Sequence, residues 1–200
     1  MDPRLKYTVR AQRYKHNPFS FGGTDWSRIL IPTEYSVGSP NAMAYGNEMK
    51  DTSSTNIVTL TSSFILPITF DKEMIDGNVF CNLKVGMEAR FDGMIGYISD
   101  VDVEIKKMFS DGSTESLSGV VALLDGGTTS GPIAGNYNVD LITGQVFGWV
   151  PVHDKVIESN EHIVITTTVI SNTTLSGYHT DTYLFYAADS DDTYFIIPFV

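Results

Sequence analysis

The segment 99–109 carries the strictest pattern in the chain, an alternation of apolar and charged residues. Apolar side chains occupy every second position from Val101 to Ile105, and carboxylates stand between them. A period of two places one face of a strand on a core and the other face in water. The following segment 110–114 contains an Asp-Gly pair, which favours a hairpin turn, so we expect 117–124 to return antiparallel.

Strand patterns of this kind continue through most of the chain after residue 55, and turn signals rich in Gly and Asp separate them. No long helical period interrupts them. The further segments that we expect to be strands are 56–62, 64–70, 78–87, 93–97, 137–142, 145–150, 161–170, 182–187 and 194–200. The segment 141–146 has the pattern of a tight hairpin that turns at Thr143 and Gly144.

This spacing predicts an all-β fold, a two-sheet antiparallel sandwich of the jelly-roll type with an extended N-terminal arm. A β-barrel is the nearest competing architecture. Two hundred residues with 42% apolar content can bury the core that one such domain needs. We expect residues 1–54 to be an arm and docking segment and residues 55–200 to be the sandwich domain.

The segment 1–54 differs from the body in composition. It holds four of the eight prolines, and the aromatic residues Phe19, Phe21 and Trp26 surround a Gly-Gly pair. Such a segment cannot fold alone, yet it is too aromatic for a solvated linker. We therefore predict that it lies extended over the body or over a neighbouring subunit, with the aromatic side chains as anchors and residues 6–9 able to pair with a sheet edge.

Charge divides the chain unevenly. Residues 1–28 carry a net charge of +4, and residues 29–200 carry −15. Complementary charge of this kind attracts an arm to a neighbouring body and weakens with salt. The basic residues that we expect to make this contact are Arg4, Lys6, Arg10, Arg13 and Lys15.

The same charges argue against several functions. A net charge of −11 makes nucleic-acid binding by the body unfavourable, because a phosphate-binding surface needs clustered Lys and Arg. The segment 1–21 holds a charge every few positions, which is not the pattern of a secretion signal. No apolar run has the length of a membrane span, so we expect a protein made and used without crossing a membrane by the general secretory route.

Cysteine and metal-ligand patterns offer little chemistry. Cys81 is the only cysteine, and it shares its strand face with Val79 and Leu83, which predicts a core position rather than a nucleophile. Asp100, Asp102 and Glu104 line one strand face, where a straight strand disperses them into solvent. The acidic loop Asp189, Asp191 and Asp192 is the better calcium candidate, although an ordinary hairpin tip explains it as well.

Catalytic motifs are absent from the sequence. The four histidines show no metal-ligand spacing, and no nucleophile elbow or phosphate-binding loop occurs. We therefore expect no enzyme activity and no cofactor. A pair of carboxylates assembled in space, as in glycoside hydrolysis, stays open because spacing along the chain does not reveal it.

Aromatic residues make up 12% of the chain and crowd its last quarter. Core packing is their first interpretation, but exposed aromatic rings also form stacking platforms for sugars and anchors at subunit interfaces. The candidates for a sugar platform are Trp149, Tyr178 and Tyr183. The apolar end 195–200 is expected to be a sandwich strand or to lie against a partner.

The basic, proline-interrupted arm, the acidic Ser/Thr-rich β body and the apolar C-terminal strand together resemble jelly-roll structural proteins of phage or archaeal virus particles. That class includes capsid, penton, decoration, collar and tail proteins. The resemblance rests on organisation and not on a diagnostic motif. It implies a homo-oligomeric shell or appendage subunit whose partners are copies of itself and other virion proteins.

The sequence therefore predicts a non-enzymatic structural subunit of a virus particle, made in the host cytoplasm and located in the virion. Inter-subunit clamping is favoured over genome packaging, because the five basic residues of the arm are spread over twelve positions. The alternative from another class is a carbohydrate-binding β-sandwich for host or glycan recognition. A sandwich-fold hydrolase or isomerase ranks third.

Overall fold

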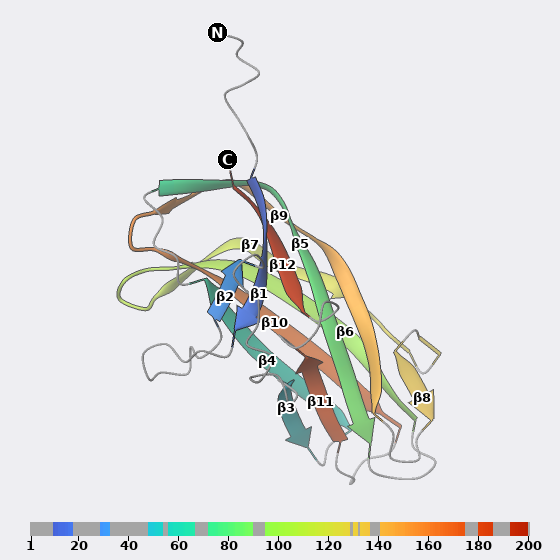
Figure 1. Cartoon of the computed structure of the whole chain (residues 1–200). Helices are drawn as coiled ribbons and strands as arrows, with labels where there is room; N and C mark the ends of the chain where they lie inside the picture. Colours follow the sequence, from blue (N-terminus) through green and yellow to red (C-terminus); the bar gives the residue numbers. More distant parts are fainter. Residues whose placement is uncertain are drawn as a thin grey trace.

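The computed structural model contains twelve strands in the part of the chain that it describes (Figure 1). The described residues are 10–17, 29–32, 48–53, 56–66, 72–89, 95–128, 130–131, 133–136, 141–174, 180–185 and 193–199. None of these residues lies in a helix. A helix with the length and hydropathy of a membrane span is accordingly not found among them.

The described strands form two layers that enclose one core. Their bounds are β1 Arg10–Asn17, β2 Ile29–Pro32, β3 Glu48–Ser53, β4 Ile57–Leu66, β5 Lys72–Ala89, β6 Ile95–Met108, β7 Thr114–Leu124, β8 Ala134–Asn136, β9 Ile142–Glu158, β10 His162–Thr173, β11 Thr180–Phe185 and β12 Tyr194–Phe199.

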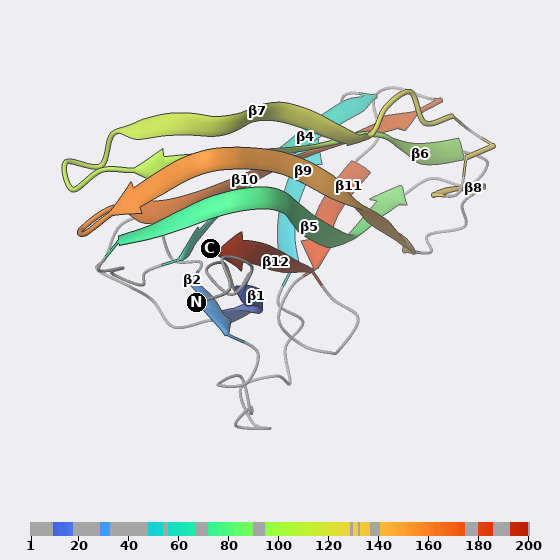
Figure 2. The same ribbon diagram turned by 90° about the horizontal axis from the view of Figure 1, so that it is seen from above.

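The first sheet has the order β1-β12-β5-β9, and the second has the order β4-β10-β6-β7. All of these pairings are antiparallel. Strand β11 continues the β12 edge of β5 and also pairs with β3, while β8 pairs with the start of β6. Strand β2 pairs antiparallel with β1 of the first sheet. A single parallel bridge between Ile29 of β2 and Ile65 of β4 joins the first sheet to the second among the described residues. In Figure 2, β7 lies toward one side of the view and β5, β12 and β1 toward the other.

The connections identify a jelly roll. Consecutive strands β4, β5 and β6 change sheet each time, β6 and β7 form a hairpin, and the chain then crosses to β9, back to β10 and on to β11 and β12. Two interleaved Greek keys produce this order, in which the chain changes sheet between β4, β5 and β6 and again between β7, β9, β10 and β11. The predicted all-β, two-sheet antiparallel sandwich is confirmed.

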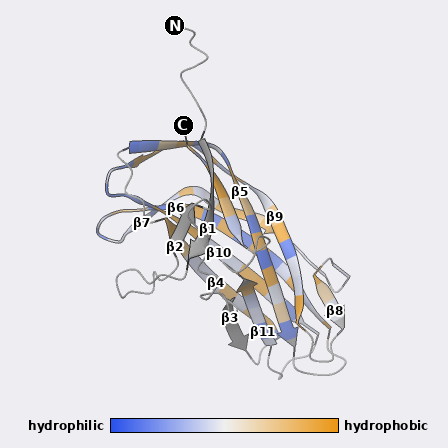
Figure 3. Ribbon diagram, viewed as in Figure 1, coloured by the Kyte–Doolittle hydropathy of each residue, from blue (hydrophilic) through white to orange (hydrophobic). Residues whose placement is uncertain are grey.

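The core lies between the sheets and is built from the inward positions of each strand. On β5, every second residue from Val79 to Met87 is fully buried. Phe64 of β4 meets Phe195 of β12 edge to face, with ring centroids 5.4 Å apart, and so links the second sheet to the first. Figure 3 shows apolar and polar residues alternating along the long strands, as a half-buried sheet requires.

The hairpin between β6 and β7 follows the sequence prediction. The amide of Phe109 donates to the Ser113 carbonyl at 2.9 Å, and the side chain of Asp111 accepts from the Ser113 amide at 2.9 Å. Gly112 adopts a positive φ of 84°, which glycine tolerates best. The Asp-Gly pair thus turns the chain by the chemistry that the sequence indicates.

One predicted turn is wrong. Thr143 and Gly144 do not form a hairpin, because β9 runs without a break from Ile142 to Glu158 and pairs with β5 along its length. Asp76 and Gly77, another Asp-Gly pair of the kind that suits a turn, lie inside β5, where the pairing with β9 shifts register. Gly77 lies at a bulge, and Gly144 leaves room for the side chain of Ile133. Glycine has a structural role within a strand at both positions and does not mark a turn.

Strand boundaries also differ from expectation. The described parts of the predicted strands 56–62 and 64–70 form one strand, β4, which runs over Ile57–Leu66, and residues 95–97 belong to the same strand as 99–108, β6. Residues 137–140 and 186–192 lie outside the described residues. Three short strands come from the segment 1–54, and they pair with β12, β4 and β11 of the body. The division of the chain after residue 54 stays a prediction.

Candidate functional site

Aromatic side chains gather on the outer surface of the first sheet. Trp149 of β9 lies opposite Phe80 of β5, with ring centroids 4.8 Å apart and ring planes at 57°. Tyr194 of β12 contacts the other side of Phe80 at 5.9 Å and 44°. Phe147 lies two residues before Trp149, on the same face of β9. We call Phe80, Phe147, Trp149 and Tyr194 the aromatic face.

Alternation along β9 creates this face. Val146 and Val150 are buried, whereas Phe147 and Trp149 are 67% and 61% exposed. Gly148 lies on the buried side of β9, where a Cβ atom would come within 2.8 Å of Leu123 Cδ2 on β7. The missing side chain at Gly148 therefore lets β9 lie close to β7, and its two aromatic neighbours point outward.

Polar residues continue the same surface toward the end of β9. His153 Nδ1 lies 3.1 Å from Asp76 Oδ1, and both side chains are exposed. Lys72 forms an ion pair with Glu158 at 2.9 Å. Asp154 adopts a positive φ of 53° beside the register shift in β5. The aromatic face is thus bounded on one side by polar groups that can donate and accept hydrogen bonds.

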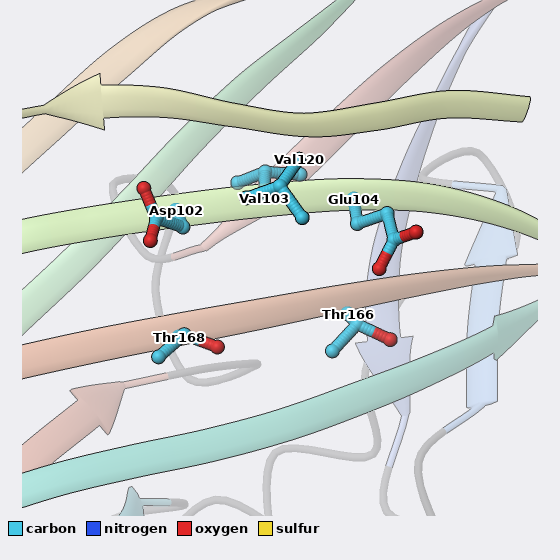
Figure 4. A pocket seen from close by; sticks show the side chains of 6 residues that line it. All are labelled: Asp102, Val103, Glu104, Val120, Thr166 and Thr168. Carbon is cyan, nitrogen blue, oxygen red and sulfur yellow. The ribbon is translucent and has the colours of Figure 1, made fainter. Parts of the chain in front are cut away.

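A second candidate is a hollow of about 220 Å³ on the outer surface of the second sheet. Asp102 and Glu104 of β6 lie opposite Thr168 and Thr166 of β10, as Figure 4 shows, and the exposed Val120 of β7 borders it. The hydroxyls of this surface bond across the strands: those of Ser63 and Thr166 are 3.2 Å apart, and those of Thr61 and Thr168 are 3.4 Å apart.

The two carboxyl groups of the hollow have opposite electrostatic surroundings. Burial raises the pKa of Asp102, and the nearby carboxylates of Asp100 and Asp125 raise it further. The pKa of Glu104 is lowered, first by a hydrogen bond from Ser116 and then by Lys106, whose Nζ lies 2.9 Å away. Ionised Glu104 is therefore compensated, and ionised Asp102 lies in a field of like charge.

A divergence of two carboxyl pKa values is the pattern of an acid–base pair. Here, however, the lowered pKa of Glu104 belongs to an ion pair with Lys106, and the two carboxyl groups are parallel neighbours on one strand face. Side chains two residues apart on a strand point the same way and do not converge on one reacting atom. The hollow is best described as a polar surface patch.

Metal and thiol chemistry find no support in the described residues. No group of three or more His, Cys, Asp or Glu side chains there could hold a metal ion. Cys81 is fully buried, and burial raises the pKa of its thiol to about 12. The predicted core position of Cys81 is confirmed.

The residues that the sequence singled out for sugar binding separate in the structure. Trp149 is exposed, as a platform requires. Tyr183 is not, because only 4% of it is exposed and its hydroxyl donates to Glu88 Oε2 at 2.8 Å, so that candidate is wrong. Tyr178 lies outside the described residues, as do the calcium candidates Asp189, Asp191 and Asp192.

The predicted interface residues fall into two groups. Arg4, Lys6, Phe19, Phe21 and Trp26 lie outside the described residues. Arg10, Arg13 and Lys15 belong to β1, where their register partners on β12 are Phe199, Ile196 and Tyr194. Strand β1 is thus part of the subunit's own sheet, and the interface role of all eight residues stays a prediction.

Sequence reasoning missed Phe80 and Phe147 as surface residues. In the segment 145–150, valine or glycine alternates with larger or polar residues, which is a strand pattern. What the pattern did not reveal is which face of the strand is buried, because both faces carry apolar side chains.

Among known proteins, no family model and no curated protein matches this chain. Solved structures match the chain at low similarity. A CocE/NonD family hydrolase from Staphylococcus aureus is 12% identical with a TM-score of 0.45, and the alignment covers 96% of this chain and 37% of the hydrolase. The chain therefore spans little more than a third of that hydrolase.

Two further structures come from other classes. The infectious bursal disease virus VP2 subviral particle is 10% identical, with a TM-score of 0.26 and coverage of 96% of this chain and 56% of that chain. A carbohydrate-binding module of the β-sandwich superfamily is 8% identical, with a TM-score of 0.28 and coverage of 94% and 86%. At these identities and TM-scores, none of the three carries a function over to this chain.

Proposed function

We propose that this chain is a non-enzymatic structural subunit of a virus particle that assembles with copies of itself. The observation that supports the proposal is the concentration of exposed apolar side chains at β9. Six large apolar residues of the described part are well exposed, and four of them, Leu141, Phe147, Trp149 and Val156, lie on β9 or directly before it. Exposed apolar side chains gathered in this way mark interaction sites.

The geometry of the aromatic face favours a protein partner. A platform for a polysaccharide needs rings that lie roughly in one plane, but Trp149 and Phe80 are inclined by 57° and Phe80 and Tyr194 by 44°. Inclined rings present edges and corners, which fit the pockets of a protein surface as interface anchors. Jelly rolls occur in viral capsids, lectins and cupins, so the fold is compatible with the proposal and does not decide it.

The basic arm supplies the second contact of the proposal. Because Arg10, Arg13 and Lys15 belong to the subunit's own sheet, the residues ahead of β1, Arg4 and Lys6, become the main candidates for reaching a neighbour. The body that they would meet carries a net charge of −15. Attraction of this kind sets orientation and weakens as salt screens it. The subunit would be made in the host cytoplasm and located in the virion.

The test is the solution mass of the full-length protein, measured by light scattering at low and high salt. We expect a defined homo-oligomer of the 22.0 kDa chain that loosens as the salt concentration rises. Deletion of residues 1–9, which leaves β1 intact, should reproduce the effect of high salt. A monomer at both salt concentrations and at every protein concentration contradicts self-assembly.

One observation favours a second function, carbohydrate binding. The Trp149 indole is 61% exposed, and the exposed Asn78 and His153 lie on neighbouring positions of the same surface. An indole with polar groups beside it can stack on a sugar and hydrogen-bond its hydroxyls. Binding on a glycan array that disappears in Trp149→Ala and persists in Val120→Ala would establish this function in place of assembly through the same face.

A further inference from the structure

We propose that two copies of this chain join along the open edge of β9, antiparallel and about a twofold axis, so that the first sheet continues from one copy into the other. The proposal rests on self-assembly as the proposed function, and it names the surface and the partner. The partner is a second copy of this chain.

Strand β9 uses one of its two edges in the sheet that the described strands form. It pairs with β5 from Ile142 opposite Met87 to Glu158 opposite Lys72, and it pairs with no other described strand. An edge strand presents a row of backbone N–H and C=O groups that a further strand can bond. At 17 residues, β9 offers more edge than the short strands that proteins use to avoid such pairing.

Pro151 indicates which residues face this edge. Proline has no N–H, so within a sheet it is placed where that group would point away from the neighbouring strand. Residues an even number of positions from Pro151 direct their backbone N–H and C=O groups to the same side of the strand as Pro151 does. The backbone groups of Thr143, Phe147 and Trp149 therefore point away from β5. Phe147 and Trp149 are also exposed on the outer face of the sheet. Phe147 and Trp149 thus have both backbone groups that can hydrogen-bond to a second strand and side chains that can pack against it.

Charge selects a second copy as the occupant. Residues 141–152 contain no Asp, Glu, Lys or Arg, although the chain as a whole carries −11. A twofold contact brings each residue near its own copy or a close neighbour, so acidic segments would repel each other there. The uncharged segment meets itself without that cost. The uncharged segment has no carboxylate that could form an ion pair with the basic arm. A second β9 is therefore a better partner for this edge than the arm of a neighbouring subunit.

The end of the uncharged segment sets the register. Pro151 removes one edge donor, and Asp154, with its positive φ, lies where the β5 pairing shifts. Regular pairing is therefore limited to the part of β9 before Pro151. An antiparallel contact centred on that part places the twofold axis at Val146 or Phe147, with the Phe147 and Trp149 side chains of both copies on one face.

The other long edge strand provides a comparison. Among the described strands, β7 pairs only with β6. The register of this pairing shifts between Glu104 and Lys106 of β6, and Gly119 of β7 has a positive φ of 70°. Bulges of this kind bend an edge and prevent regular pairing. Val120 on β7 and Phe147 on β9 are both 67% exposed, so they form a matched pair for a test.

Cysteine crosslinking of the full chain tests the geometry. Phe147→Cys and Val120→Cys are oxidised under the same mild conditions, and Cys81 adds no background because its thiol is buried. We expect a disulfide-linked dimer from Phe147→Cys at several times the yield from Val120→Cys. Equal yields from the two variants would overturn the proposal.

A second pair of variants tests the edge without a new thiol. Thr143→Pro removes a backbone donor that faces the open edge and keeps the pairing with β5, while Thr143→Ala removes the same side chain and keeps the donor. We expect the mass by light scattering to fall at least twofold for Thr143→Pro only, with both variants folded by circular dichroism. If both variants keep the oligomer of the parent protein, the β9 contact is wrong and self-assembly stands. A parent protein that is monomeric contradicts both.

Discussion

Trp149 and Phe80 face each other across the β9–β5 ladder, with ring centroids 4.8 Å apart and ring planes at 57°. Such tilted pairs contribute about 0.5–1.5 kcal/mol beyond the area that they bury. We expect a double-mutant cycle with Phe80→Leu and Trp149→Leu to give a coupling energy in that range, measured as the free energy of unfolding in urea. Strict additivity of the two single substitutions would show that the ring contact contributes nothing.

The contact between Phe64 and Phe195 links the two sheets and should matter far more. Both rings are fully buried, with centroids 5.4 Å apart. Phe195→Ala leaves a cavity that the sandwich cannot close, so we expect a loss of about 3–5 kcal/mol in the free energy of unfolding. Val120→Ala, at an exposed position, should change it by no more than about 0.5 kcal/mol. Similar losses in both variants would contradict the observed core.

These two aromatic pairs show what can be predicted from the sequence. The apolar composition of 194–200 predicts a strand, and Phe195 lies in the core as part of a sandwich strand. The outward position of Phe147 is not predicted. Its segment is apolar on both faces, and the face that becomes buried is decided by β7, which approaches β9 at Gly148. A contact between two strands that lie far apart in the chain leaves no local pattern.

The turns show the same limit in another form. The Asp-Gly pair at residue 111 turns the chain because Asp111 caps the turn with its own side chain. Thr143 and Gly144 also suit a turn by composition, yet they lie inside β9. A Cβ atom on Gly144 would come within 2.5 Å of the Ile133 side chain. Glycine there provides room for a neighbour and not a turn. Sequence alone does not distinguish these two uses of glycine.

Cys81 offers a direct measure of core integrity. Its side chain is fully buried on β5, and burial raises the pKa of the thiol to about 12. The thiolate is the reactive species, so the native protein should not react with a thiol reagent at pH 8. In urea, one thiol per chain should become reactive across the unfolding transition. Labelling of the folded protein at the rate of a free thiol would show that β5 opens without global unfolding.

The surroundings of Asp102 lead to a pH-dependent prediction. Its pKa is raised by burial and then by Asp100 and Asp125, so the folded protein binds this proton more tightly than the unfolded chain does. Ionised Asp102 therefore lowers stability at pH 7, and the cost disappears as the pH falls through its folded pKa. We expect Asp102→Asn to raise the melting temperature at pH 7 by about 1–3 °C, as for a surface charge effect of up to about 1 kcal/mol.

Asp111 provides the opposite sign as a control. Hydrogen bonds from the Ser113 side chain and backbone lower its pKa, so ionised Asp111 stabilises the turn above its unfolded pKa, and that contribution is lost as the pH falls through the folded pKa. Asp111→Asn should lower the melting temperature at pH 7. Thermal scans from pH 7 to about pH 3 should bring both variants toward the parent protein, from above for Asp102→Asn and from below for Asp111→Asn. Shifts of the same sign in both variants would show that net charge, and not the local field at each carboxyl group, controls the stability of the sandwich.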